Sequence, residues 1–280
     1  MADSFRIALI GGGNMGGALA AGLLRTKRGP VTGPELLVID PHPGDAVQDL
    51  VANAGLTVLP ELTAKAAADL DLVIFALKPQ AFEPAAAALS GRLSPETGVI
   101  SLMPGVTLNR MATALGERPL IRAMSNTAAA VGAAMSVCVA NDAGEALEKP
   151  VTRLFKGVGT VEWVADERMI GAVTAVSGSG PAYVFLLAEA LAGAAFAEGL
   201  PRDLADKLAR ETIIGAGALL AKSGKTPQEL RRAVTSPNGT TQAAVDVLMG
   251  AGGGLPELVR QAVAAAERRS RQISQDPGKR

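Results

Sequence analysis

The feature that most constrains the fold is residues 6–20, in which an apolar run leads through clustered glycines into a segment of small residues. Residues 11–16 read GGGNMG and fit the pattern G-x-G-x-x-G. The first glycine of that pattern permits a tight turn, the second admits a pyrophosphate, and the third lets helix and strand pack closely. A turn without a ligand is the alternative. We expect six residues to contact a dinucleotide, on free N–H groups at the helix N-terminus: Gly11, Gly12, Gly13, Asn14, Met15 and Gly16.

An acidic residue ends the second apolar run. Residues 35–40 read ELLVID, so that Asp40 closes the run. A carboxylate at this place accepts hydrogen bonds from the ribose hydroxyls and repels the 2′-phosphate of NADP. No arginine follows in residues 41–45, where only His42 could assist a phosphate weakly. Asp40 therefore favours NAD, and the alternative role is a turn-forming residue ahead of Pro41.

Length and composition exclude several classes of protein. A chain of 280 residues suggests two domains. The formal net charge is zero and the basic residues are scattered, so we expect neither nucleic acid nor an acidic membrane surface as a partner. The single cysteine, Cys138, lies in an apolar run and is expected to be a buried small side chain. No cluster of His, Cys and carboxylate residues has the spacing of a metal site.

The sequence also favours a cytoplasmic protein without a membrane span. The first predicted strand begins within a few residues of the first methionine, which leaves no room for an export leader. The longest apolar tract, residues 182–197, is interrupted by Glu189 and is shorter than the roughly 20 residues that a bilayer requires. We expect this tract to be a buried helix in a helical interface.

The first half of the chain alternates apolar runs with alanine-rich segments, which is typical of a doubly wound, mainly parallel α/β sheet of the Rossmann type. The predicted strands are residues 6–10, 35–40, 56–58, 71–77, 98–102, 120–124, 135–140 and 159–164. The predicted helices are residues 14–26, 44–53, 61–67, 80–89, 108–115 and 143–155.

The pattern changes after Val164, where only long Ala- and Leu-rich helical periodicity remains. We therefore predict a dinucleotide-binding domain at residues 1–164 and an all-helical domain at residues 165–280. Small residues in the predicted helices, Gly193, Ala194, Gly215 and Gly217, would let helices approach closely, as in a tight dimer. Ordinary packing within one chain explains them equally well.

Two loops follow predicted strands at the sheet edge where a dinucleotide would lie. Residues 76–79 read ALKP, and the Lys78 ammonium could contact a ribose or phosphate oxygen. A solvated lysine ahead of a helix-opening proline is the alternative. Residues 122–127 read RAMSNT, in which Asn126 and Thr127 could bond a nicotinamide or a substrate, or simply form a helix cap. The further coenzyme contacts that we predict are Asp40, Ala76, Leu77, Lys78, Pro79 and Asn126.

Two polar segments interrupt the helical half. Residues 176–184 read VSGSGPAYV, where Ser177 and Ser179 could face a ligand or mark a kink. Residues 236–242 read SPNGTTQ and lead into a helix, so the backbone N–H groups at its start could hold a small carboxylate. An ordinary N-cap explains the same residues.

Taken together, IGGGNMG, ALKPQ, RAMSNT, VSGSGPAYVF and SPNGTT resemble the pyrroline-5-carboxylate reductases, and the resemblance spans nearly the whole chain. It implies reduction of 1-pyrroline-5-carboxylate to L-proline by NADPH or NADH. It also implies a Rossmann domain followed by a helical dimerisation domain, so that the protein forms a homodimer or a ring of dimers. By this resemblance the substrate site comprises Ser236, Asn238, Gly239, Thr240 and Thr241, with the Thr241 hydroxyl on the ring nitrogen.

The residues suit this chemistry in one respect. The only histidine, His42, lies outside the helical half, so a dehydrogenase of 2-hydroxy acids would lack an obvious base. A cyclic imine needs less help, because its nitrogen can arrive protonated. We expect Thr241 to act as hydrogen-bond partner or proton donor, and Lys78 is the second candidate catalytic residue.

Three departures from the family pattern lie near the sheet edge where a dinucleotide would bind. Residues 124–128 read MSNTA where the family has M-P-N-T-P, so Ser125 and Ala128 replace two prolines. Residues 101–106 read SLMPGV in place of S-x-A-A-G-V. Many members carry a small or basic residue at the position of Asp40 and prefer NADPH, whereas Asp40 favours NADH.

Two alternative functions remain open. A β-hydroxyacid dehydrogenase shares the glycine turn and the domain order but needs a lysine shortly after a G-x-G in the second domain, and residues 178–185 contain none. A related reductase of another cyclic imino acid is a variant of the same chemistry. The alternative from another class is a non-catalytic nucleotide-binding protein, which the polar SPNGTT segment disfavours.

Overall fold

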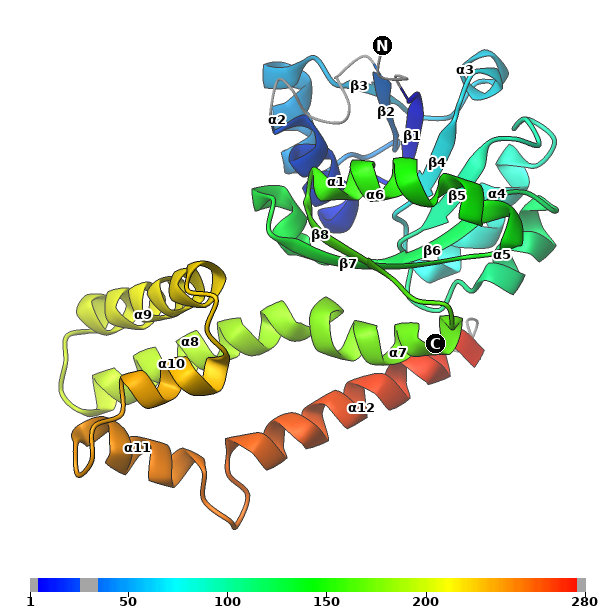
Figure 1. Cartoon of the computed structure of the whole chain (residues 1–280). Helices are drawn as coiled ribbons and strands as arrows, with labels where there is room; N and C mark the ends of the chain where they lie inside the picture. Colours follow the sequence, from blue (N-terminus) through cyan, green and yellow to red (C-terminus); the bar gives the residue numbers. More distant parts are fainter. Residues whose placement is uncertain (1–4, 26–34, 276–280) are drawn as a thin grey trace. The chain divides into compact units, whose positions relative to one another are not determined.

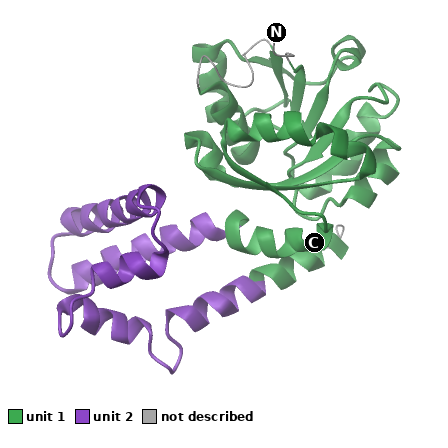
Figure 2. Ribbon diagram, viewed as in Figure 1, with its two compact units in different colours: residues 1–178, 266–280 green, residues 179–265 purple. Residues whose placement is uncertain are grey.

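The computed structural model describes residues 5–25 and 35–275 (Figure 1). The predicted end of the first helix, at Thr26, lies outside the described residues. Contacts between residues divide the chain into two compact units (Figure 2). Unit 1 comprises residues 1–178 and 266–280, and unit 2 comprises residues 179–265.

Unit 1 is built on one sheet of eight strands in the order β3-β2-β1-β4-β5-β6-β7-β8. The strands are short apolar runs, each within two residues of the predicted start and end. They are β1 (Ile7–Ile10), β2 (Leu36–Ile39), β3 (Thr57–Leu59), β4 (Leu72–Phe75), β5 (Gly98–Ser101), β6 (Leu120–Met124), β7 (Ala134–Ala140) and β8 (Gly159–Trp163). The predicted doubly wound sheet is confirmed.

The sheet is parallel except between β6 and β7, where Ala123 lies opposite Cys138 in an antiparallel pair. Strand β1 lies between β2 and β4, so the connections leave it in opposite directions on its two sides. In such sheets the ligand crevice forms at this point of reversal, outside the carboxyl ends of the strands.

Helices cover both faces of the sheet, as Figure 1 shows, because alternate residues of each strand point to opposite faces. In β1, Ile7 and Leu9 pack into one core with helices α1 and α6, whereas Ala8 and Ile10 pack into another with α3, α4 and α5. Both faces are apolar, as expected of a parallel sheet that is buried on both sides. The helices are α1 (Asn14–Leu24), α2 (Asp45–Ala54), α3 (Ala64–Ala68), α4 (Phe82–Leu89), α5 (Leu108–Leu115), α6 (Glu148–Lys156) and α7 (Ile170–Val173).

Short turns of other helical types join these elements. In the described part of the chain, 3₁₀ helices include η2 (Pro79–Ala81), η3 (Thr127–Val131), η4 (Asp142–Leu147) and η5 (Glu167–Met169). The element η6 (Thr174–Gly178) is a π helix that continues α7. The expected buried position of Cys138 is confirmed, because its side chain is fully buried and burial raises the pKa of the thiol to about 12.

Unit 2 is entirely helical in its described residues. Its helices are α8 (Gly180–Ala197), α9 (Arg202–Lys222), α10 (Pro227–Ala233), α11 (Thr240–Leu248) and α12 (Leu255–Gln275), the last of which continues into unit 1 at Ala266. Large apolar side chains of this unit are exposed, with Phe185 at 69% and Leu186 at 63%.

Residues 182–197 are helical as expected, but the expectation that this tract is too short to cross a bilayer is wrong. Its expected burial in a helical interface stays a prediction, because α8 is mostly exposed in the single chain. Helical structure runs without a break over residues 167–197, and this stretch is long and apolar enough to cross a membrane by length and composition. The stretch is longer than predicted because the π helix η6 carries the chain through the glycines at 178 and 180. Of α8, only Ala192 is buried, so its apolar faces are available to another surface.

The contacts divide the chain at a different place from the predicted boundary after residue 164. Residues 166–178 belong to unit 1 because Ile170 is fully buried against Met124, Val137 and Val139. The end of α12 also belongs to unit 1, where Ile273 packs on Gly105. The boundary at 164 and 165 stays a prediction about evolutionary domains rather than about compact units.

We predict that Gly22→Ala destabilises the protein. A Cβ at Gly22, in α1, would lie 2.3 Å from the carbonyl oxygen of Ala129 and 2.7 Å from Cγ1 of Val158. Overpacking of this kind costs about 1–3 kcal/mol, which outweighs the gain of about 1 kcal/mol in helix propensity. The free energy of unfolding in urea measures the difference.

Gly17→Ala in the same helix is the matched control. Its Cβ would first meet the Cβ of Ala46 at 3.3 Å, which a shift of α2 by a few tenths of an ångström relieves. We expect the free energy of unfolding of Gly17→Ala to lie within about 1 kcal/mol of that of the parent. Equal destabilisation by both variants would contradict the close packing of α1 on η3.

Candidate functional site

The glycine loop between β1 and α1 has the geometry that its sequence predicts. Gly11 has a φ of +105°, and a Cβ there would lie 2.7 Å from the carbonyl oxygen of Ala76. A Cβ at Gly16 would lie 1.9 Å from the carbonyl oxygen of Gly11, so helix and strand approach as closely as glycine allows. Both positions therefore exclude side chains for steric reasons.

The tip of this loop is open. A Cβ at Gly13 would meet nothing within 4 Å among the described residues, and Gly13 and Asn14 are exposed while Met15 is half-buried. Gly13 caps α1 without any side-chain hydrogen bond to the first turn. The N–H groups of that turn are consequently donors for an anion, in the positive field of the helix N-terminus. This end of α1 fits a pyrophosphate.

Asp40 fastens the end of β2 to the glycine loop. Its Oδ2 accepts a hydrogen bond of 2.6 Å from the Gly12 N–H, and its Oδ1 accepts one of 2.8 Å from the His42 N–H. The Gly44 N–H donates in turn to the carbonyl oxygen of Gly12 at 3.1 Å. The carboxylate thus shapes the loop, and each oxygen keeps acceptor capacity for a further donor.

The loop after β4 lies against the glycine loop, because Ala76 contacts Gly11 and its N–H donates to Ile10. Ala76, Leu77 and Pro79 are half-buried, whereas Lys78 is exposed. Within the described residues the Lys78 side chain has no ion-pair partner, so its ammonium is free to meet an anion.

Arg110, in α5, holds this loop from the other side. It donates to the carbonyl oxygen of Pro79 at 3.2 Å and forms two hydrogen bonds to the Glu83 carboxylate, at 2.6 and 2.7 Å. Its guanidinium also lies 5.6 Å from the centre of the Phe82 ring. The hydrogen bonds from Arg110 lower the pKa of Glu83. The sequence does not predict this contact, because Arg110 and Glu83 lie in different helices.

Asn126 ends the loop after β6. Its Nδ2 donates to the carbonyl oxygen of Ser177 at 3.0 Å, and its buried Oδ1 has no hydrogen-bond partner in the described part of the chain. The hydroxyl of Ser177, which we expected could face a ligand, donates instead to the Val173 carbonyl at 3.1 Å. Thr127 is exposed at the start of η3.

Ser125, one of the residues that replaces a family proline, has a partner of its own. The Ser136 hydroxyl in β7 donates to the Ser125 hydroxyl at 2.8 Å, and both side chains are buried. This hydrogen bond ties the loop to the antiparallel neighbour of β6. The bond therefore supplies a restraint where a proline ring would otherwise stiffen the chain.

The predicted coenzyme residues converge at one edge of unit 1. They follow the carboxyl ends of β1, β2, β4 and β6, which run parallel within the same sheet. Direct contacts join the residues of the glycine loop to Asp40 and Ala76. Asn126 lies at the same edge by topology, and its Nδ2 donates to Ser177 rather than to the glycine loop.

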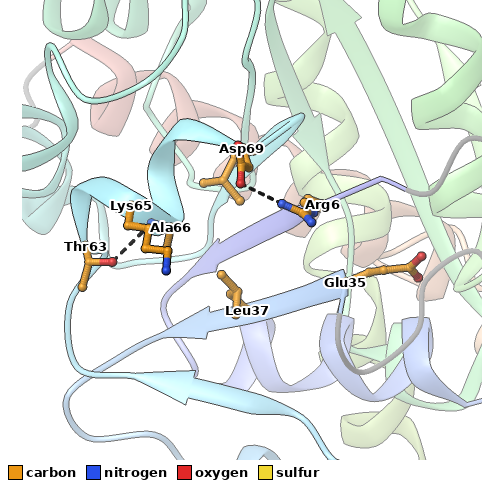
Figure 3. Close-up of a pocket in the computed structure, with 8 residues that line it drawn as sticks. Arg6, Glu35, Leu37, Thr63, Lys65, Ala66 and Asp69 are labelled. Atoms are coloured by element: carbon orange, nitrogen blue, oxygen red, sulfur yellow. Dashed lines mark hydrogen bonds and ion pairs between the residues drawn. The ribbon is translucent and has the colours of Figure 1, made fainter.

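A pocket of about 320 Å³ in the same unit lies at the opposite edge (Figure 3). Arg6 and Glu35, which precede β1 and β2, line it together with Thr63, Lys65 and Asp69. The exposed Arg6 and Asp69 pair at 2.9 Å across it. Because these residues stand at the amino ends of the strands, the pocket is no part of the dinucleotide edge.

The predicted substrate residues form a loop in unit 2. Asn238 has a φ of +58°, which is uncommon for a residue other than glycine, and Gly239 then starts α11 without a side-chain cap. A hydrogen bond of 3.1 Å from the Gly239 N–H to the Ser236 carbonyl closes the turn. Ser236, Thr240 and Thr241 are exposed. The uncapped N-terminus of α11 presents donors that fit a carboxylate.

Comparison with known proteins agrees with both halves of this description. Residues 167–273 match the family model "Pyrroline-5-carboxylate reductase dimerisation", and residues 6–105 match "NADP oxidoreductase coenzyme F420-dependent". The pyrroline-5-carboxylate reductase of Arabidopsis thaliana is 39% identical over 275 residues, which cover 98% of this chain and 97% of that protein.

Two solved structures extend the likeness to the fold. A pyrroline-5-carboxylate reductase from Coxiella burnetii has a TM-score of 0.85 and 32% identity, covering 97% of this chain and 99% of that chain. The pyrroline carboxylate reductase of Plasmodium falciparum, solved with NADP bound, has a TM-score of 0.81 and 26% identity, covering 96% and 98%. By full-length identity and by fold, this chain belongs to the pyrroline-5-carboxylate reductase family.

Proposed function

We propose that this protein reduces 1-pyrroline-5-carboxylate to L-proline with a reduced nicotinamide coenzyme, as a step of proline biosynthesis. The likeness to reductases of that name over almost their whole length carries the proposal. The glycine loop and the uncapped α11 supply the two kinds of site that the reaction requires. A β-hydroxyacid dehydrogenase would need a lysine early in α8, and residues 180–197 contain none.

In the proposed reaction the coenzyme supplies a hydride to the imine carbon. The first-turn N–H groups of α1 hold the pyrophosphate, and Lys78 neutralises a phosphate or bonds a ribose oxygen. Asn126 offers its unpartnered Oδ1 to an amide donor such as that of the nicotinamide. Together these residues would hold the coenzyme, which supplies the hydride.

A positive charge on the ring nitrogen of the substrate favours hydride addition to the imine carbon. When the ring nitrogen carries a proton, hydride addition to the carbon moves the C=N electron pair to nitrogen and yields the neutral secondary amine. The N-terminus of α11 holds the carboxylate, with Ser236, Asn238, Gly239 and Thr240 forming the turn. The Thr241 hydroxyl bonds the ring nitrogen and keeps the imine carbon oriented for hydride transfer.

Asp40 supports NADH as the preferred coenzyme. Its carboxylate is fixed at the end of β2 by two backbone donors, where the adenosine ribose of a dinucleotide lies in this fold. A 2′-phosphate at that place would face a negative charge, with no arginine or lysine in residues 40–49 to offset it. The P. falciparum relative was solved with NADP bound.

The exposed apolar helices of unit 2 support a homodimer formed through that unit, and a ring of such dimers is the larger assembly that we propose. The apolar stretch at residues 167–197 lies wholly within the matched dimerisation model, at 167–273. We therefore assign its surface to a second copy of the chain rather than to lipid. On this assignment the protein is cytoplasmic.

The test of the reaction is the initial rate of NADH and NADPH oxidation with 1-pyrroline-5-carboxylate. We expect fast turnover with the five-membered imine and slower turnover with 1-piperideine carboxylates. We expect none with 3-hydroxyisobutyrate in the reverse direction. Activity on a six-membered imine alone would overturn the substrate and implicate the Ser125 and Ala128 loop.

We predict that Asp40→Asn raises the ratio of kcat/KM for NADPH to that for NADH about 10-fold, the effect of about 1.4 kcal/mol of relieved repulsion. The amide can accept only one of the two backbone hydrogen bonds, so the thermal midpoint must be recorded as well. Asp49→Asn removes an exposed carboxylate from α2, the helix that follows Asp40 in the chain, and should leave the ratio unchanged. An equal ratio in both variants would show that Asp40 does not discriminate between the coenzymes.

We predict that Thr241→Ala lowers kcat about 100-fold, a typical loss for a group that acts on the reacting atom, while the Kd for the coenzyme stays constant. Thr241→Ser keeps the hydroxyl and should recover most of the rate. Coenzyme affinity is measured by fluorescence titration. A parallel loss of coenzyme affinity and kcat in Thr241→Ala would mean that the residue supports the fold of the site instead.

A further inference from the structure

A second pocket of unit 1 contains none of the residues assigned to the reaction. It has a volume of about 540 Å³, within the range of about 300–1,000 Å³ that small-molecule sites occupy. It lies where the end of α12 runs beside α7, both within the larger unit of Figure 2. The residues on which its chemistry depends are Thr107, Arg122, Glu167, Arg168, Arg271 and Ser274.

The floor of the pocket holds an arginine with too few partners. Arg122, in β6, is 4% exposed, and its Nη1 donates to Oε1 of Glu167 at 2.9 Å. The same oxygen accepts the Leu108 N–H at 3.0 Å. Within the described residues this is the single hydrogen bond of the Arg122 side chain, and its buried Nε has no partner.

A buried guanidinium that makes a single hydrogen bond still has donors without an acceptor. Arginine carries five N–H donors, and its Nε and Nη2 form an edge that matches two oxygens of one carboxylate or phosphate. In Arg122 the Nη1 donates to Glu167 and the unpartnered Nε is shielded from solvent, so Nη2 is the remaining donor for a ligand in the pocket. Buried donors of this kind are satisfied in proteins by protein groups, by ordered water or by a ligand.

Two more arginines reach the pocket from other elements. Arg168, in η5, forms an ion pair with Asp166, and Arg271, in α12, forms an ion pair with Glu267. Each guanidinium keeps donors beyond those used by its carboxylate partner. The carboxylates of Asp166, Glu167 and Glu267 balance the three arginines in charge, so selection rests on directed hydrogen bonds rather than on net charge.

The hydroxyls on the pocket wall add weaker donors and acceptors. Thr107 Oγ1 accepts the Arg110 N–H at 3.2 Å and retains its own proton, whereas Ser274 Oγ donates to the Ser270 carbonyl at 3.1 Å. These groups stand on the N-cap of α5 and on α12. A ligand here would touch the sheet, α5 and the C-terminal helix together.

We propose that this pocket binds a small oxyanion, a carboxylate or a phosphate compound, through the remaining Nη2 donor of Arg122 and the guanidiniums of Arg168 and Arg271. The ligand bridges β6 and α12 and so fastens the end of the C-terminal helix to the sheet. This site is independent of the proposed reaction, because it shares no residue with the coenzyme edge or with the α11 loop.

Calorimetric titration of the full-length protein, saturated with NADH, tests the site. Inorganic phosphate and malonate are the two probes, each at constant ionic strength set with sodium chloride. We expect saturable binding of at least one probe, and the stronger probe identifies the class of oxyanion. Arg271→Gln and Arg168→Gln should each raise the Kd at least 10-fold.

Arg269→Gln is the matched control, since Arg269 lies on the same helix, donates to Gln272 and is not among the described residues that line the pocket. It should bind as the parent does. Binding that survives Arg271→Gln but is lost in Thr241→Ala would place the anion at the α11 loop and overturn the proposal. Absence of saturable binding in the parent would also overturn it, leaving ordered water as the partner of Arg122.

Discussion

The coenzyme edge of unit 1 depends on the close approach of α1 to β1. A side chain at Gly16 would place its Cβ 1.9 Å from the Gly11 carbonyl oxygen, so the helix can begin where it does only without one. This contact aims the uncapped first turn of α1 across the end of the sheet. The loops after β2 and β4 are then positioned by their contacts with Gly12 and Gly11.

Much of this arrangement could be predicted from the sequence, because each parallel strand is a short apolar run closed by a polar or glycine-rich loop. The periodicity of such runs is local information. Parallel order then places Gly11, Asp40 and Lys78 at one edge without any knowledge of contacts. The extent of the strands and the residues of the edge followed from these two facts.

Other features depend on contacts between distant residues. Nothing local distinguishes β7 as the antiparallel strand, or shows that Arg110 would brace Pro79 and Glu83. The glycines around the π helix η6 favour a break in the chain, so the sequence does not indicate that helix continues there. For this reason the predicted apolar stretch is shorter than the observed one. The partner of Arg122, Glu167 in η5, likewise lies 45 residues further along the chain.

The hydrogen bonds of Asp40 have a consequence for the thermodynamics of ligand association. By joining the Gly12 and His42 N–H groups, the carboxylate orders two glycine-containing loops as part of folding. Their conformational entropy is therefore lost before any dinucleotide arrives, and association need not bear that loss again. The loops present a preorganised surface, so a bound dinucleotide gains residence time from rigidity as well as from its contacts.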